Sequence, residues 1–198
     1  PAAALFKSAQ DGTLKGFALP GTMALAARTK IEPVESRNVV AKLAGSDAVL
    51  AAEHIVYTAH LDHIGIGAPV KDENGVEDSI YNGALDNALG VSIMFETART
   101  LRATKPAPKR SLLFIALTAE EKGLLGAEWF ASHPTVPAAA LVANINMDMP
   151  ILLAPTRDVV PIGIDHSTLK SALDTAANEI GVSLSPRSEE RRVGKECV

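Results

Sequence analysis

The stretch SLLFIALTAEE, residues 111–121, is a run of apolar residues that ends in two adjacent carboxylates. Ser111–Leu117 has the length and continuous hydrophobicity of a buried strand, and Thr118 is a typical residue for the start of a helix. In open α/β sheets, ligands bind where strands end and the following helices begin. This stretch therefore predicts both a fold class and the edge of the sheet at which a site lies.

Outward from this stretch, apolar runs alternate with helical patterns. Leu89, Ile93, Thr97 and Leu101 recur at four-residue spacing, which predicts a helix that begins near Asp86 and ends before the proline-rich segment 104–110. The other expected elements are strands at Asn38–Leu43, His54–Ala59, Ala140–Met147 and Val159–Ile164, and helices from Thr118 to about Ser132 and from about Ser167 to Ile180. This order predicts an α/β fold with a mixed, mostly parallel sheet flanked by helices on both faces. Residues 64–81, rich in Gly, Asp and Asn, are too long and polar for a tight connection and predict a functional loop near an active site.

The composition bounds the class of protein. The 198 residues are 47% hydrophobic and 21% charged, which is typical of one globular domain. A net charge of −4 and 4% aromatic residues argue against a nucleic-acid partner, because phosphate binding needs a basic face. The apolar runs are far shorter than the ~20 residues of a membrane span, and the single cysteine, Cys197, excludes an internal disulfide.

Side chains suited to hard metal ions follow the predicted strands and helix start in order. The candidates are His60, Asp86, Glu120, Glu121 and Asp148. An imidazole and several carboxylates, without thiolates, are typical of a co-catalytic pair of divalent ions that share one carboxylate. Asp86 is the natural bridge, and the carboxylate of Asp62 can hydrogen-bond the far ring nitrogen of His60. Of the two adjacent glutamates, one can ligate while the other acts as general base for a metal-bound water.

Each candidate taken alone also has a purely structural explanation. These explanations are helix capping for Asp86 and Asn87, a capping box for Glu121 with Thr118, a turn for Asp148, and a hydrogen-bonded interior position for His60. Together they require five independent coincidences at one edge of one sheet. The joint interpretation, a two-metal hydrolase site, is therefore favoured.

Four ordered motifs carry a family resemblance: AHLDH at 59–63, NGALDNALG at 82–90, TAEEKGLLGA at 118–127 and NINMDM at 144–149. They resemble the zinc-dependent exopeptidases of metallopeptidase family twenty-eight, typified by bacterial leucyl aminopeptidases. The resemblance covers about residues 36–187 and implies the phosphorylase/hydrolase-like zinc peptidase fold, two zinc ions and a peptide substrate. It implies these roles: His60 and Asp148 on one zinc, Asp86 as bridge, Glu121 on the other zinc, Glu120 as general base, and Asp62 orienting His60.

One expected ligand has no counterpart. The family supplies the last ligand of the second zinc from a histidine in a Ser-Asp-His type segment, and the later histidines, His133 and His166, lie outside such a motif. The second zinc site is therefore expected to be incomplete and the chain as written to have little activity. His63 is expected to line the site or to pack beside it, and His54 to be a strand residue.

The expected domain organisation has three parts. Residues 1–35 are predicted to be a remnant or edge segment, similar to the exit from an inserted protease-associated domain, and residues 36–187 a partial zinc peptidase domain, incomplete at both ends. Residues 188–198, SEERRVGKECV, carry six charges in eleven residues without periodicity and predict a non-native tail.

The metal motifs leave the reaction partly open. The main prediction is an aminopeptidase, in an extracytoplasmic location implied by the resemblance. The alternatives are a carboxypeptidase or another amide-processing relative on the same scaffold, and a non-catalytic receptor or adhesion module of the same fold. The oligomeric state is not predicted.

Overall fold

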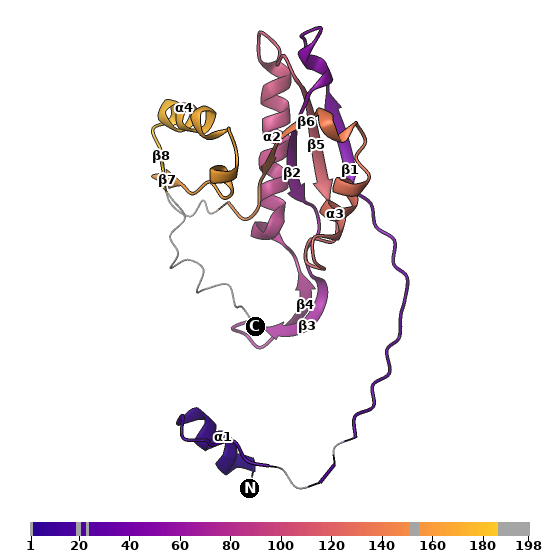
Figure 1. Ribbon diagram of the computed structural model, residues 1–198, viewed down its shortest axis with the longest axis vertical. Coiled ribbons are helices and arrows are strands. Elements are labelled where there is room, and N and C mark those ends of the chain that lie inside the picture. Colours follow the sequence, from indigo (N-terminus) through magenta and orange to yellow (C-terminus); the bar gives the residue numbers. More distant parts are fainter. Residues whose placement is uncertain (1, 19–20, 23, 151–154, 186–198) are drawn as a thin grey trace. The chain divides into compact units, whose positions relative to one another are not determined.

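The computed structural model describes residues 2–18, 21–22, 24–150 and 155–185 (Figure 1). The chain divides into two compact units, Pro1–Glu35 and Ser36–Val198. In the first unit, helix α1 spans Ala2–Gln10 and has no buried residue. The prediction of a non-native tail at 188–198 lies outside the described residues.

The second unit contains the remaining regular elements (Figure 1). Its strands are β1 Val39–Leu43, β2 His54–His60, β3 Gly65–Lys71, β4 Glu77–Tyr81, β5 Ser111–Leu117, β6 Leu141–Asn146, β7 Asp158–Val159 and β8 Ser183–Leu184. Its helices are α2 Leu89–Ala103, α3 Leu125–Ser132 and α4 Lys170–Ile180, with short 3-10 turns at Leu50–Ala52, Ala138–Ala140 and Ile164–His166 and a π-helical turn at Ala84–Ala88. Among the described residues, no helix has the length and apolarity needed to cross a membrane.

The central sheet has the strand order β1-β5-β2-β6. Strand β2 pairs in parallel with β5 and with β6, whereas β1 runs antiparallel to β5. The apolar runs that predicted these strands have the observed boundaries to within one residue at most ends, and β5 has the predicted bounds, Ser111–Leu117. The prediction of a mixed, mostly parallel sheet is confirmed.

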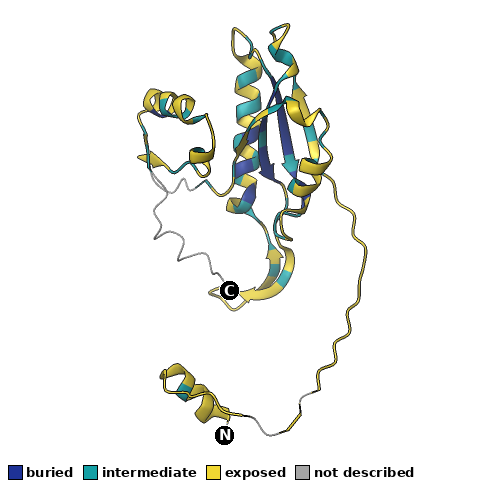
Figure 2. Cartoon of the chain, viewed as in Figure 1, coloured by how far each residue is buried: buried dark blue, intermediate teal, exposed yellow. Residues whose placement is uncertain are grey.

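Nearly every residue of strand β5 is buried (Figure 2). Because successive side chains point to opposite sides of the sheet, both faces of the strand are therefore covered. Leu113 and Ile115, 2% and 0% exposed, belong to a cluster that packs against Ala127 and Phe130 from α3. On the other face, Leu112, Phe114 and Ala59 pack with Met94, Val91, Ala98 and Leu101 of α2. Helices therefore cover both faces, as predicted, and the continuous apolar sequence of β5 follows from its central place.

The helix predicted from Thr118 begins seven residues later, at Leu125. Residues 118–124 form a turn in which Ala119 and Leu124 have positive φ values of 54° and 61°. Thr118 Oγ1 hydrogen-bonds Asp62 instead of capping a helix. The capping-box explanation for Glu121 is therefore wrong, and the two glutamates lie in the turn between β5 and α3.

Residues 64–81, predicted as a functional loop, contain a β-hairpin. Strands β3 and β4 pair antiparallel, and Asp72 Oδ1 closes the turn by accepting the N–H groups of Asn74 and Val76, both at 2.8 Å. An Asx turn of this kind explains why a stretch rich in Gly, Asp and Asn still forms paired strands.

The predicted strand Val159–Ile164 is also wrong beyond its first residue. Strand β7 is only Asp158–Val159, paired in parallel with β8. Pro161 has no backbone N–H for a ladder, and Gly163 has a φ of 84°. The helix predicted from about Ser167 begins at Lys170 and ends at Ile180, as predicted.

Candidate metal centre

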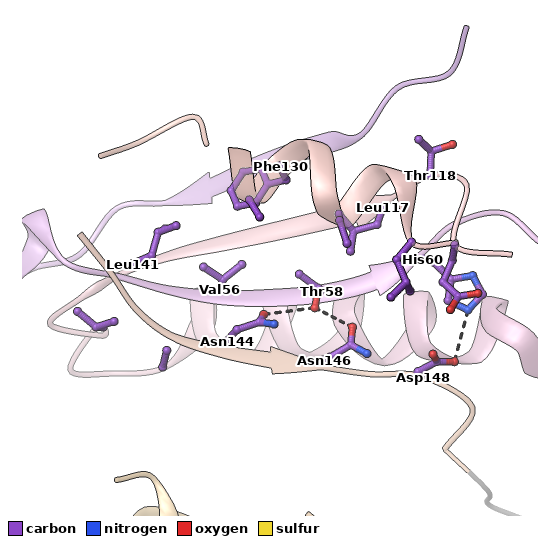
Figure 3. A pocket seen from close by; sticks show the side chains of 16 residues that line it. Val56, Thr58, His60, Leu117, Thr118, Phe130, Leu141, Asn144, Asn146 and Asp148 are labelled. Carbon is purple, nitrogen blue, oxygen red and sulfur yellow. Dashed lines mark hydrogen bonds and ion pairs between the residues drawn. The ribbon is translucent and has the colours of Figure 1, made fainter. Parts of the chain in front are cut away.

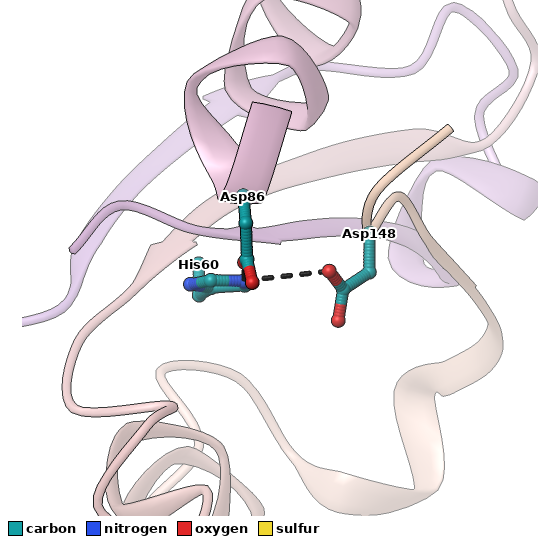
Figure 4. Close-up of side chains that lie close together, drawn as sticks. All are labelled: His60, Asp86 and Asp148. Atoms are coloured by element: carbon teal, nitrogen blue, oxygen red, sulfur yellow. Dashed lines mark ion pairs between the residues drawn. The ribbon is translucent and has the colours of Figure 1, made fainter. Parts of the chain in front are cut away.

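The parallel pairing of β2 and β6 brings His60 and Asp148 together. Thr58 lies opposite Asn146, the last residue of β6, so His60 at the end of β2 and Asp148, two residues beyond the end of β6, lie side by side on the same face. His60 Nε2 is 3.4 Å from Asp148 Oδ1 (Figure 4). The register of the sheet therefore positions the first pair of candidate ligands.

Asp86 reaches the same place from the turn before α2. Its φ and ψ, −113° and 88°, lie outside the helical region. Asp86 Oδ1 is 3.0 Å from His60 Nε2 (Figure 4). The residue that caps the helix is its neighbour: Asn87 Oδ1 accepts the N–H of Gly90 at 3.0 Å. Of the two residues that the sequence suggested as helix caps, Asn87 therefore bonds the start of α2, whereas Asp86 points to His60.

Asn87 also links Asp86 to the strand end that carries Asp148. Its side chain is 2% exposed, and its Nδ2 donates to the carbonyl of Met147 at 2.9 Å. Its Oδ1 accepts the N–H of Met149 at 3.4 Å. The amide of Asn87 therefore contacts the backbone on both sides of Asp148 and fixes the distance between the two carboxylates.

The hydrogen bonding of His60 leaves one ring nitrogen without a donor. Nδ1 lies 2.8 Å from the carbonyl of Asp62, which can only accept, so Nδ1 carries the proton. In a neutral ring, Nε2 is then a lone pair that faces carboxylate oxygens of Asp86 and Asp148. The residue is 3% exposed, and Nε2 has no hydrogen-bond partner among the described residues. Three electron-rich atoms meet here, and a shared cation satisfies all of them.

The electrostatics of this cluster affect two ionisable groups. Burial lowers the pKa of His60, but the hydrogen bond to Asp62 and the charges of Asp148, Glu120 and Asp86 outweigh it and leave the pKa above its usual value. The pKa of Glu120 is also raised, chiefly by burial, with the neighbouring carboxylates adding to it against the effect of His60. The neighbouring carboxylates contribute to both shifts, and their combined negative charge attracts a divalent cation.

A second group of donor atoms lies beside the first and shares Asp86. His63 Nδ1 is 2.6 Å from Glu121 Oε1 and 3.8 Å from Asp86 Oδ2. The ligand atoms of His63, Asp86 and Glu121 lie within 4.8 Å of one another, as do those of His60, Asp86 and Asp148. One carboxylate thus presents Oδ1 to one group and Oδ2 to the other, which is the arrangement that a bridging ligand needs.

Asp62 holds the site by different atoms from those predicted. Its backbone carbonyl, not its carboxylate, contacts the ring of His60. The carboxylate Oδ2 accepts the N–H of Ala119 at 2.6 Å and the hydroxyl of Thr118 at 3.0 Å. Asp62 therefore orients His60 through its backbone and fixes the turn of Glu120 and Glu121 through its side chain.

A cavity of about 580 Å³ opens beside His60, Glu120 and Asp148 (Figure 3). Its wall includes the apolar side chains of Leu124, Ala127, Phe130 and Leu141. Its polar lining includes Thr58, whose hydroxyl donates to Asn146 Oδ1 at 2.7 Å and lies 3.3 Å from Asn144 Oδ1 (Figure 3). Glu120 faces this space but belongs to neither group of candidate ligands found among the described residues.

The other three histidines lie outside both groups. His54 is buried at the start of β2, His133 stacks on Trp129 with ring centroids 3.9 Å apart, and His166 ends a 3-10 turn before α4. The sequence context of these three histidines likewise predicted positions outside the site. The contact of His63 with Glu121 was not predicted, because its only signal in the sequence is the position of His63 three residues after His60.

The fold and the site together define a class of protein: an α/β sheet whose parallel strands end in two histidine and carboxylate groups joined by one aspartate. The family follows from the sequence comparison. Residues 38–197 match the model of Peptidase family M28, and the chain belongs to this family. The resemblance of the four motifs is confirmed.

Known relatives agree with this assignment. The chain is 33% identical over 120 residues to a probable zinc metalloprotease of Pyrenophora teres f. teres, a match that covers 60% of this chain and 23% of that protein. Its fold resembles a zinc aminopeptidase of Bacillus subtilis, with a TM-score of 0.55 and 27% identity over 75% of this chain and 34% of the other. A glutaminyl cyclase of Porphyromonas gingivalis shares the fold, with a TM-score of 0.55 and 20% identity over 76% of this chain and 56% of the other. The chain thus spans about a quarter to a half of these proteins.

Proposed function

We propose that this chain carries the two-zinc centre of an aminopeptidase that removes the N-terminal residue of peptides. The observation that carries the proposal is the position of Asp86, whose Oδ1 lies 3.0 Å from His60 Nε2 and whose Oδ2 lies 3.8 Å from His63 Nδ1. A carboxylate between two groups of ligands is what a co-catalytic metal pair requires. Membership of Peptidase family M28 supports the peptidase part of the proposal.

The proposed roles divide the residues into ligands and a base. His60 and Asp148 would hold one zinc, Glu121 would hold the other, and Asp86 would be a ligand shared by both. Bound zinc supplies Lewis acidity that polarises the scissile carbonyl and makes water a better nucleophile. Glu120 faces the cavity and has a raised pKa, chiefly because of burial. It is the general base that takes a proton from the attacking water and then gives it to the leaving amine.

The orienting role proposed for Asp62 follows from its two contacts. The carbonyl fixes the tautomer of His60 that leaves Nε2 free to ligate, and the carboxylate holds the N–H of Ala119 next to the base. Asp62 is therefore a positioning residue. It links the strand end of His60 to the turn of Glu120, so that ligand and base keep a fixed relation.

An aminopeptidase is preferred to the other reactions because the Bacillus subtilis structure is that of a zinc aminopeptidase. A carboxypeptidase, or an amide-processing enzyme such as the glutaminyl cyclase that shares the fold, is the alternative within enzymes. A non-catalytic receptor or adhesion module is the alternative outside them. The extracytoplasmic location is kept as part of the proposal on the family resemblance alone.

The direct test compares zinc content and peptide hydrolysis in Glu120→Gln and Asp86→Ala. In the full-length protein, Glu120→Gln is expected to keep the zinc content of the wild type and to lower hydrolysis by about 10²–10⁴-fold, the usual contribution of a general base. Asp86→Ala is expected to lose both metal and hydrolysis. Glu128→Gln, a change on the exposed surface of α3, is the matched control. Hydrolysis that persists in Glu120→Gln would remove the proposed base.

A second assay separates the alternatives. An aminopeptidase cleaves a peptide with a free N-terminus and fails on the same peptide after acetylation, whereas a carboxypeptidase cleaves both. A glutaminyl cyclase releases ammonia from an N-terminal glutamine without shortening the peptide. A receptor module leaves all of these peptides unchanged.

A further inference from the structure

We propose that His63 is a ligand of the second metal position, where it binds through Nδ1 beside Glu121 and the shared Asp86. The inference rests on the two-metal centre of the proposed function and gives His63 a ligand role that the family resemblance does not assign to it. The second position then has three protein ligands from the described residues, the same number as the first.

The distances fit a cation between these atoms. Ligand atoms on a tetrahedral zinc, each about 2.0–2.1 Å from the metal, lie about 3.3 Å from one another. His63 Nδ1 is 2.6 Å from Glu121 Oε1 and 3.8 Å from Asp86 Oδ2, one distance below that value and one above it. Side-chain rotations that move atoms by less than about 1 Å bring both to the separation that zinc requires.

The backbone of the NGALDNALG motif leaves room for the ring of His63. Gly83 has a φ of 64°, and a Cβ atom there would lie 2.7 Å from His63 Cβ and 2.6 Å from the carbonyl oxygen of Asp86. Any side chain at this position would push His63 away from Asp86. The NGALDNALG motif, which contains Asp86, therefore also leaves the space that the side chain of His63 occupies.

The charges at this position call for a cation. Among the described residues, the side chains within ion-pair distance of Asp86 and Glu121 are His60 and His63. Lysine and arginine are thus not among the partners found for these two carboxylates. His63, Asp86 and Glu121 are 19%, 28% and 24% exposed, so a metal ion can enter while its ligands stay partly screened from water.

The competing explanation is that His63 only orients Glu121 by a hydrogen bond. The two explanations differ in the expected effect of His63→Asn. The amide of asparagine can stand in for the Nδ1–H donor of histidine toward Glu121, but it is a poor zinc ligand. A hydrogen-bonding role is therefore rescued by His63→Asn, whereas a ligand role is not.

The test is a zinc titration of the purified protein and its variants, with the bound metal counted by mass spectrometry and the affinities measured by competition with a chelator. With His63 as its third ligand the second position is complete, so the wild type is expected to bind two equivalents, contrary to the sequence-based expectation of an incomplete second site. His63→Ala and His63→Asn are both expected to keep the first and to weaken the second by more than about 100-fold, since loss of a ligand exceeds the 10–100-fold effect of an outer partner. His133→Ala, which removes an exposed histidine outside both groups, is the control and should match the wild type. Circular dichroism verifies that each variant is folded.

The outcomes separate this inference from the proposed function. Two tight equivalents in His63→Ala, or a second equivalent restored in His63→Asn, would overturn the role of His63 and leave the two-metal centre intact. A wild type that binds one equivalent overturns the second position. A wild type that binds no zinc overturns the proposed function itself. Substitution with cobalt gives a further readout, because each ligated imidazole contributes its own shifted N–H proton resonance, and His63→Asn should remove one.

Discussion

Alanine substitutions at Gly83 and Gly75 separate the cost of a positive φ from the cost of a steric clash beside the candidate metal centre. Both have a positive φ, 64° and 78°, so alanine pays a similar conformational penalty of about 1 kcal/mol at each. Only at Gly83 does the added Cβ meet other atoms, at 2.6 Å from the Asp86 carbonyl oxygen and 2.7 Å from His63 Cβ, whereas nothing lies within 4 Å at Gly75. Overpacking of this kind costs about 1–3 kcal/mol.

We therefore expect Gly83→Ala to destabilise the protein by about 2–4 kcal/mol and Gly75→Ala by about 1 kcal/mol. Thermal unfolding of the metal-free proteins measures the difference, which at roughly 2–4 °C per kcal/mol is about 4–8 °C for a 2 kcal/mol gap. Zinc titration then measures the effect on the centre, where Gly83→Ala should weaken the second equivalent and Gly75→Ala should not. Equal melting temperatures and equal zinc affinities in the two variants would refute the reasoning.

Two further predictions concern Asn87 and the proton on His60. Asn87→Ala leaves the buried N–H of Gly90 and the partly buried carbonyl of Met147 without partners, at about 1–3 kcal/mol for each group, so we expect a loss of about 2–6 kcal/mol in denaturant unfolding together with weaker zinc binding. Asn82→Ala, at an exposed position in the same motif, is the control. Similar unfolding midpoints for both variants would contradict a stabilising role of the Asn87 amide. Although burial opposes it, the hydrogen bond to Asp62 and the nearby carboxylates hold the pKa of His60 above its usual value in the metal-free protein. Below that pKa zinc must displace a proton, so its apparent affinity should fall with falling pH, toward about tenfold per pH unit for one proton. Calorimetry in buffers of different ionisation enthalpy measures the proton release, and an affinity that stays constant from about pH 8 to about pH 5 would show that His60 is not a ligand.

The sheet was predictable because its strands are encoded locally. Every residue from Leu112 to Leu117 is apolar, so both faces of this strand are apolar, and the sequence alone predicts a strand that is covered on both sides. The stripe Leu89, Ile93, Thr97 and Leu101 likewise predicted a helix, which α2 confirms, but the residues of α2 that pack on the sheet are Val91, Met94, Ala98 and Leu101, so the stripe gave the helix and only one residue of its buried face. These patterns depend on burial, which the order of apolar and polar residues records directly.

One error lies where a tertiary contact overrules local preference. Thr118 has the sequence of a helix start, but its hydroxyl donates to Asp62, 56 residues away in the chain, and Ala119 has a positive φ. A short window of sequence around Thr118 does not contain this partner. The hairpin at residues 64–81 is a different case, because its turn is closed locally by Asp72, so the signal was present in the segment itself and its composition alone suggested a loop.

The sequence by itself determined the fold class, the order of the ligand-bearing motifs and the residue types of a metal centre, because hydrophobic periodicity and hard-ligand chemistry are properties of single segments. Only the tertiary structure decided which atoms meet. The β2 and β6 register places His60 beside Asp148, and the turn before α2 gives each oxygen of Asp86 to a different histidine. The tertiary structure also shows that His60 contacts the backbone carbonyl of Asp62 and not its predicted side chain, and that His63 contacts Glu121. The distances of 2.6 Å and 3.8 Å join residues of different motifs, so they depend on how the strands and turns pack together, which the sequence of a single motif does not contain.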